Sequence, residues 1–282
     1  MNWIAIVLAG HFLNALAFLM DKFLLSSKRI PSPFLIPFGV VIPSSVEVIR
    51  ALVAGATFIL ALVFFFAGLK ENEASRVVPL TGGFVPAFTF VLAYFFLGER
   101  LGQTEILAFA ALVAGSVLIT LERRGRGRAL GYAYAVMAAF VFAASFVITK
   151  QVYLEQAFIS GFVWSRIGGF LMALSFLLIP SARYGIFHQP KQKGTGTTAV
   201  LFFTGQAAGA LGFVLVNYAI SLASVSLVNA MQGVQYAFLL IMVVLLSKKF
   251  PRVLSERLTG GVLAQKIAAI VLISIGIGLI AF

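Results

Sequence analysis

Several polar side chains lie within a long apolar run near the C-terminal end of this 282-residue chain. They are Asn229, Gln232, Gln235 and Tyr236, and positions 229, 232 and 236 follow the i, i+3, i+7 spacing of one helical face, with 235 at its edge. Amides and a phenol on such a face can hydrogen-bond a zwitterionic or polyhydroxylated metabolite. The same side chains can instead join neighbouring helices. The sequence leaves both roles open.

Arg166 is the second candidate, because it lies in the middle of the apolar stretch FVWSRIGGF. A guanidinium stays charged at any accessible pH and donates in a fork, which suits a substrate carboxylate or phosphate. The alternative is that the side chain reaches a membrane surface. His11 can likewise be a site residue or simply a hydrogen-bonded core histidine. The remaining substrate-binding candidates inside apolar segments are Trp164, Gln206, Asn217, His11 and Asn14.

Chemistry other than binding finds little support in the sequence. The two histidines, His11 and His188, have no Asp/Glu cluster beside them, and the chain has no cysteine. No glycine-rich phosphate-binding loop precedes a basic residue. We therefore expect no enzyme activity, no metal and no cofactor. No carboxylate lies at the centre of a clear apolar segment, so proton coupling through an acid is not indicated; uniport, exchange or coupling through His11 stay open.

Composition places the chain in a membrane. Hydrophobic residues make up 61% of the sequence and charged residues 11%, and the mean hydropathy is +1.05. A soluble domain of this size needs more polar surface than that. The net charge of +12 comes from basic residues in short gaps between apolar runs, which indicates membrane orientation and not nucleic-acid binding. The lipid bilayer and a small metabolite are the expected partners.

The apolar segments predict an all-α, polytopic helical membrane protein with about nine full spans. One segment, Phe34–Ile42, is too short to span and is interrupted by Pro37. It predicts a truncated helix near residues 31–44. The full helices are expected at residues 2–25, 51–69, 79–97, 105–121, 129–152, 158–179, 198–222, 226–246 and 262–282.

The hairpin between residues 74 and 122 carries the strongest motif. A proline-bearing helix leads to the charged elbow Gly98-Glu99-Arg100-Leu101, and a glycine-bearing helix follows. We expect Glu99 and Arg100 to cap helix ends, and the glycine pairs at 82–83 and 168–169 to allow close helix contact. A shift of 149 residues aligns Ala74 with Ala223. After a short insertion, the tetrapeptide at 255–258, SERL, matches the elbow GERL. This order predicts an internal repeat.

The pattern AS-V…VP…LGERL…G resembles the EamA domain of the drug/metabolite transporter superfamily. The resemblance implies two inverted five-helix repeats around a central cavity, here with an incomplete second helix. The implied function is secondary transport of a small polar or amphipathic metabolite by an exporter or exchanger. The alternative is a non-transporting scaffold or partner subunit. The implied units are residues 1–122, a basic linker at 123–128, and residues 129–282.

Basic residues gather on alternate sides of the predicted helices, so one side is expected to be cytoplasmic. If the segment 34–42 crosses, both termini lie outside, whereas members of the resembled family usually have cytoplasmic termini. We expect a multi-pass protein of a bacterial or archaeal plasma membrane. A homodimer in which a second copy supplies the missing helix is a further hypothesis.

Overall fold

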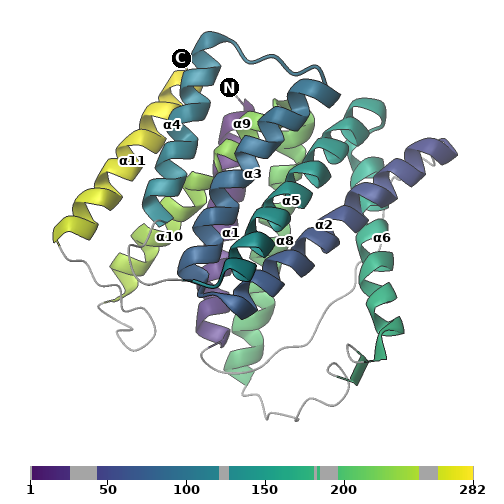
Figure 1. Ribbon diagram of the computed structural model, residues 1–282, viewed down its shortest axis with the longest axis horizontal. Coiled ribbons are helices and arrows are strands. Elements are labelled where there is room, and N and C mark those ends of the chain that lie inside the picture. The colour runs from purple at the N-terminus through teal and green to yellow at the C-terminus, as the bar shows by residue number, and fades with distance from the viewer. Residues whose placement is uncertain are drawn as a thin grey trace.

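The computed structural model describes residues 2–25, 43–120, 127–180, 183–184, 196–247 and 260–281. Within these ranges the chain is a bundle of helices with no strand (Figure 1). Its helices are α1 (Asn2–Leu25), α2 (Ser45–Glu71), α3 (Ala74–Phe96), α4 (Gln103–Thr120), α5 (Ala129–Glu155), α6 (Phe158–Ser175), the 3-10 turn η1 (Phe176–Leu178), α8 (Gly196–Leu222), α9 (Val225–Ala230), α10 (Gln232–Ser247) and α11 (Gly260–Ala281).

Length and apolar composition make the described part of the chain a polytopic membrane protein. Seven of its helical stretches are long and apolar enough to cross a bilayer, and two shorter ones, Trp3–Leu16 and Gln103–Ile119, are also apolar. The expected figure of about nine full spans is therefore supported for seven. The truncated second helix, the basic linker at 123–126 and the SERL repeat at 255–258 lie outside the described residues.

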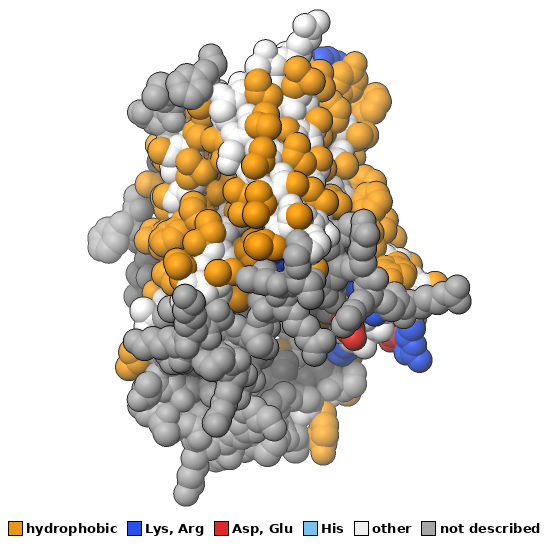
Figure 2. Space-filling model, turned by 90° about the vertical axis from the view of Figure 1, so that its left-hand side faces the viewer, with side chains coloured by type: hydrophobic (Ala, Val, Ile, Leu, Met, Phe, Trp, Pro, Cys, Tyr) orange, Lys and Arg blue, Asp and Glu red, His pale blue; other side chains and the backbone are white. Residues whose placement is uncertain are grey.

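One described face of the bundle is rich in apolar side chains. Figure 2 shows a face on which hydrophobic side chains cover most of the described surface. On α11 the exposed residues Leu263, Ile267, Val271 and Ile275 recur every fourth position and form one stripe. An exposed apolar stripe of this kind is costly in water and favourable against acyl chains, so it is typical of a helix at the edge of a membrane bundle.

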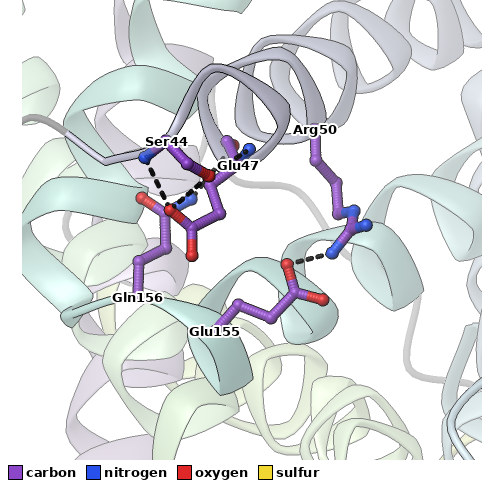
Figure 3. A network of polar contacts seen from close by, with 5 residues as sticks. All are labelled: Ser44, Glu47, Arg50, Glu155 and Gln156. Atoms are coloured by element: carbon purple, nitrogen blue, oxygen red, sulfur yellow. Dashed lines mark hydrogen bonds and ion pairs between the residues drawn. The ribbon is translucent and has the colours of Figure 1, made fainter.

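A network of polar contacts fixes the beginning of α2 against the end of α5 (Figure 3). Ser44 and Glu47 form a capping box, in which each side chain accepts a backbone N–H of the other residue. Arg50 pairs with Glu155, and the Gln156 side chain donates to the Glu47 carbonyl at 3.0 Å. These contacts join two helices that are far apart in the sequence.

Glycines bring α2 and α6 into backbone contact. A methyl group on Gly55 would overlap the Ser165 carbonyl oxygen, and one on Gly168 would overlap the backbone of Leu52. The predicted role of the glycine pair at 168–169 in close helix contact is confirmed. The pair at 82–83 also serves contact: a methyl group on Gly82 would lie 2.6 Å from the hydroxyl oxygen of Tyr236, which comes from α10.

The first helix runs antiparallel to α8. Gly10 lies against Gly212 and Val216, while Asn14, one turn later, lies against Gly212. Because α8 ends and α2 begins at the same end of the bundle, α1 and α2 run in the same direction (Figure 1).

The charged elbow after α3 is tied to the beginning of α9. The Glu99 carboxylate accepts the Ser224 hydroxyl at 2.7 Å and the backbone N–H groups of Val225 and Ser226 at 3.1 and 3.3 Å. Gly98 permits the turn, since its φ of 66° lies in the left-handed region. Arg100 donates to the Tyr94 carbonyl near the end of α3. The prediction that both charged elbow residues cap helix ends is confirmed.

Lys150 also stabilises the turn between α8 and α9. Its ammonium group donates to the carbonyls of Ile220 at 2.9 Å, Ser221 at 3.4 Å and Ala223 at 2.9 Å, which are the last carbonyls of α8 and the residue after it. A cation is favourable there because the C-terminal end of a helix leaves its carbonyls unpaired and carries partial negative charge. The α8–α9 turn is thus held by one anion and one cation.

The predicted continuous helix at 226–246 is wrong in one respect. A tighter turn at Met231 separates α9 from α10: the Met231 N–H bonds to the Leu227 carbonyl, and the Val234 N–H bonds to the Met231 carbonyl only three residues earlier. The two pieces still form one apolar span, Val225–Leu245.

Candidate functional site

Arg166 lies inside the bundle and is surrounded by aromatic rings. The backbone contact between α6 and α2 turns this side chain toward α2 and α8. Its guanidinium carbon is 5.7 Å from the ring centroid of Phe58 on α2, 5.4 Å from that of Phe162 on α6, and 4.5 Å from that of Phe213 on α8. Three helices thus place rings around one cation, a geometry in which the ring faces attract its charge.

Arg166 has no acidic partner among the described residues. The ion pairs found there join Arg50 with Glu155, Arg76 with Glu73 and Arg128 with Glu71. The Nε atom of Arg166 is buried and has no hydrogen-bond partner. An unpaired charge inside a membrane protein is costly, so Arg166 is a candidate to bind an anionic group of a ligand.

Two polar side chains border the aromatic rings. The Tyr153 hydroxyl donates to Asn217 Oδ1 at 3.0 Å, and Asn217 Nδ2 donates to the Phe213 carbonyl at 2.9 Å. Tyr153 also lies within electrostatic range of Arg166. We call Arg166, Phe58, Phe162, Phe213, Tyr153 and Asn217 the arginine site. It offers a positive fork, apolar ring surface and a hydrogen-bonded phenol, which together suit a carboxylate attached to an apolar group.

A second polar group lies on α1 and α10. His11 is buried, with 4% of its surface exposed, and it lies beside the Gln235 side chain and the Val228 carbonyl. Both ring nitrogens of His11 are buried, and neither has a hydrogen-bond partner. Gln235 is itself 5% exposed. We call His11, Gln235 and the Val228 carbonyl the histidine site.

The four polar residues expected on one face of a single helix make different contacts. Asn229 donates to the Val225 carbonyl of its own helix at 3.0 Å, and Tyr236 lies against Gly82 of α3. Gln235 lies beside His11, and Gln232 is partly buried. Substrate contact by Asn229, Gln232 and Tyr236 stays a prediction.

The other sequence candidates fall in different surroundings. Asn14 packs against Gly212 of α8, in the interface of α1 with that helix. Gln206 is exposed on the surface of α8. Trp164 is partly buried, and its indole N–H is enclosed without a hydrogen-bond partner. A hollow of about 600 Å³ between α3 and α5 contains none of the candidates. It is lined by Phe88, Tyr132, Ala133, Val136, Met137 and Phe140.

Sequence reasoning missed the rings and the phenol of the arginine site. Phe58, Phe213 and Tyr153 stand in apolar runs among 29 phenylalanines and seven tyrosines, so their residue types gave no signal. They become neighbours through the packing of α2, α5, α6 and α8. The described residues include no group of three or more His, Cys, Asp or Glu side chains that could hold a metal ion.

Comparison with known proteins finds similarity to transporters. Residues 1–121 match the EamA-like transporter family. A protein of Streptantibioticus cattleyicolor described as "Probable terminal-alkyne amino-acid exporter" is 26% identical over 196 residues, which cover 67% of this chain and 62% of that protein. The match thus spans less than two thirds of the exporter's length. A crystal structure with 16% sequence identity superposes with a TM-score of 0.59 over 97% of this chain and 86% of that one, which is a likeness of fold.

Proposed function

We propose that the chain is a transporter of the EamA-like family, whose model matches residues 1–121, and that it exports or exchanges small carboxylates with an apolar side chain. It is a multi-pass membrane protein and not an enzyme. Transport would proceed by alternating access, in which the bundle exposes the arginine site to each side of the membrane in turn.

The unpaired Arg166 carries this proposal. A substrate carboxylate would supply the anion that the described residues do not, and two parallel N–H···O bonds would fix its direction. The rings of Phe58, Phe162 and Phe213 would then contact the rest of the molecule. Amino acids with apolar side chains meet both requirements, and the description of the Streptantibioticus relative points to the same class.

Packing supports the two-repeat arrangement that the family resemblance implies. α1 packs along α8, and α2 packs along α5, so the first two described helices each pair with a helix of the second half. α4 likewise packs along α11. Inverted repeats would produce such exchanged pairs, and they would put the substrate site where the halves meet.

The test is counterflow in proteoliposomes. Vesicles that hold the purified full chain are loaded with unlabelled phenylalanine, and entry of labelled phenylalanine is followed. Competition with phenethylamine, which has the ring but no carboxylate, tests the role assigned to Arg166. We expect phenylalanine to compete at least about tenfold better, because a charge-assisted bond is worth about 1.5–3 kcal/mol. Equal competition would contradict the carboxylate anchor, and no counterflow with any amino acid would favour the scaffold alternative.

Matched arginine variants sharpen that test. Arg166→Gln should reduce counterflow at least about tenfold, and Arg166→Lys should restore part of it, because a lysine keeps the charge but loses the fork. Arg100→Gln serves as the control, since Arg100 is stacked on Tyr94 at 3.5 Å at the end of the bundle. An Arg100→Gln protein as impaired as Arg166→Gln would show that the loss reflects general damage.

A further inference from the structure

The hollow between α3 and α5 lies on the outside of the bundle and has apolar walls. Phe88 lines it from α3, and Ala133, Val136, Met137 and Phe140 line it from α5. Ala133, Met137 and Phe140 are exposed, so the hollow is open at the surface. Both helices are long and apolar enough to cross a bilayer, which means that this opening faces acyl chains and not water.

The two helices lie side by side (Figure 1) and run in the same direction along the hollow. At one end, the Asn72 side chain just before α3 accepts the backbone N–H of Arg128 at 2.7 Å. Further along both helices, the rings of Phe88 and Phe140 have their centroids 5.6 Å apart. Positions on α3 and α5 therefore increase together, and both helices begin at the same end of the hollow.

Each wall continues toward that end as a row of residues four positions apart, and each row begins with an arginine. Residues four apart in a helix lie one above the other on the same face. Within the rows, Phe84 stacks on Phe88, and the Tyr132 hydroxyl accepts the Gly127 N–H at 3.2 Å, next to Arg128. The row on α3 is Arg76, Leu80, Phe84 and Phe88, and the row on α5 is Arg128, Tyr132, Val136 and Phe140.

Both arginines keep donors that a ligand can use. The contact of Arg76 Nη2 with Glu73 is 3.4 Å long, whereas a charge-assisted bond is usually about 2.7–2.9 Å, and Arg76 Nε is buried without a hydrogen-bond partner. Arg128 gives Nη1 to Glu71 at 2.8 Å, and 75% of its side chain is exposed. Since a guanidinium has five N–H donors, each of these ion pairs leaves several for the oxygens of an anion.

We propose that the hollow is a binding site for an anionic phospholipid. One acyl chain lies against Phe88 and Phe140, and the phosphate accepts N–H groups of Arg76 and Arg128. An acyl chain alone would need no cations, and a free phosphate would need no hollow, so the combination fits a molecule that has both parts. The positive-inside rule assigns this end of the bundle to the cytoplasm, the side on which anionic lipids gather. The proposal does not depend on the transported substrate.

The first test measures lipid binding by native mass spectrometry of the purified full chain in detergent. Phosphatidylglycerol should bind at least about fivefold more tightly than phosphatidylcholine, which has the same chains and phosphate but a compensating choline cation. Glycerol 3-phosphate, the headgroup without chains, should not compete at equal concentration. Equal affinity for the two lipids, full competition by glycerol 3-phosphate, or no bound lipid would each overturn the proposal.

Paired arginine variants test the polar end of the site. Arg76→Gln combined with Arg128→Gln should weaken phosphatidylglycerol binding at least about tenfold, because two charge-assisted contacts are lost. Phosphatidylcholine binding should change much less. Arg183→Gln is the control, since Arg183 is an exposed arginine that does not line the hollow. An unchanged affinity in the double variant, or the same loss in Arg183→Gln, would contradict the assigned phosphate contacts.

A filled hollow tests the apolar end. Ala133 is exposed and lines the hollow, so Ala133→Trp places a ring where the chain would lie without disturbing a buried position. We expect phosphatidylglycerol binding to fall at least about tenfold, and Ala268→Trp, at an exposed alanine of α11, to leave it unchanged. Equal binding by both variants would overturn the proposal. If Ala133→Trp instead converted a dimer into a monomer with lipid binding intact, the hollow would belong to a second copy of the chain.

Discussion

Two cations in this bundle, Lys150 and Arg166, have opposite surroundings. Lys150 donates to three carbonyls at the α8–α9 turn, and it feels the charge of Glu99 across that turn. Arg166 is enclosed by three rings, and its Nε has no partner. The sequence shows both as single charges in apolar helices. The difference teaches that the number of satisfied donors, and not the presence of a charge, separates a structural cation from one available to a ligand.

The largest effect should come from removing the backbone contact that holds Arg166 in place. Gly168→Leu would force a side chain into the backbone of Leu52 and push α6 away from α2. We expect counterflow to fall to background and the yield of folded protein to drop, because neither backbone can yield without loss of helix packing. Gly169→Ala is the matched control: a methyl group there would be 3.4 Å from its nearest neighbours. Normal transport by Gly168→Leu would refute the close contact.

The next largest effect should be that removing the two cations changes the stability of the protein in opposite directions. Lys150→Met leaves three carbonyls without their donor, so we expect a loss of about 1.5–3 kcal/mol in stability, seen as a lower thermal midpoint in detergent. Arg166→Met removes an unpaired charge, so the midpoint should stay equal or rise while transport is lost. Equal destabilisation by Lys150→Met and Arg166→Met would show that Arg166 is as much a structural cation as Lys150.

Glu99 tests the same turn from the anionic side. Glu99→Gln keeps the shape but replaces a carboxylate that accepts three donors by a neutral amide, and we expect a loss of about 1–2 kcal/mol in stability. Glu105→Gln is the control, because Glu105 accepts one exposed backbone N–H, from Gly102 at 2.8 Å. Thermal midpoints of the two variants that fall by the same amount would show that the cap on α9 is not special.

The smallest effect is expected at the edge of the arginine site. Tyr153→Phe removes the hydroxyl that donates to Asn217 and leaves one amide oxygen unpaired, which costs about 1 kcal/mol. The concentration of phenylalanine at half-maximal counterflow should change about two- to threefold, because the ring and Arg166 remain. A change as large as that in Arg166→Gln would mean that the phenol, and not the guanidinium, dominates binding.

The sequence predicted the features that depend on local pattern. Apolar length gave the helices, the elbow gave Glu99 and Arg100 as caps, and the glycine pair at 168–169 gave a close contact. It did not predict the turn at Met231, since no proline or glycine occupies that position. Nor did it predict the rings around Arg166, because three phenylalanines from three helices become neighbours only through packing. The substrate contacts themselves remain predictions.

The backbone contact of α2 with α6 also determines which wall of the arginine site can separate. Phe58 and Phe162 belong to these two helices, which touch without intervening side chains at Gly55 and Gly168, so they should travel as one stiff unit. Phe213 belongs to α8, whose end is pinned by Lys150 and Glu99 through the turn that follows it. Opening of the site would then occur by movement of α8 with Phe213 about the α8–α9 turn, while Phe58 and Phe162 stay in place relative to each other.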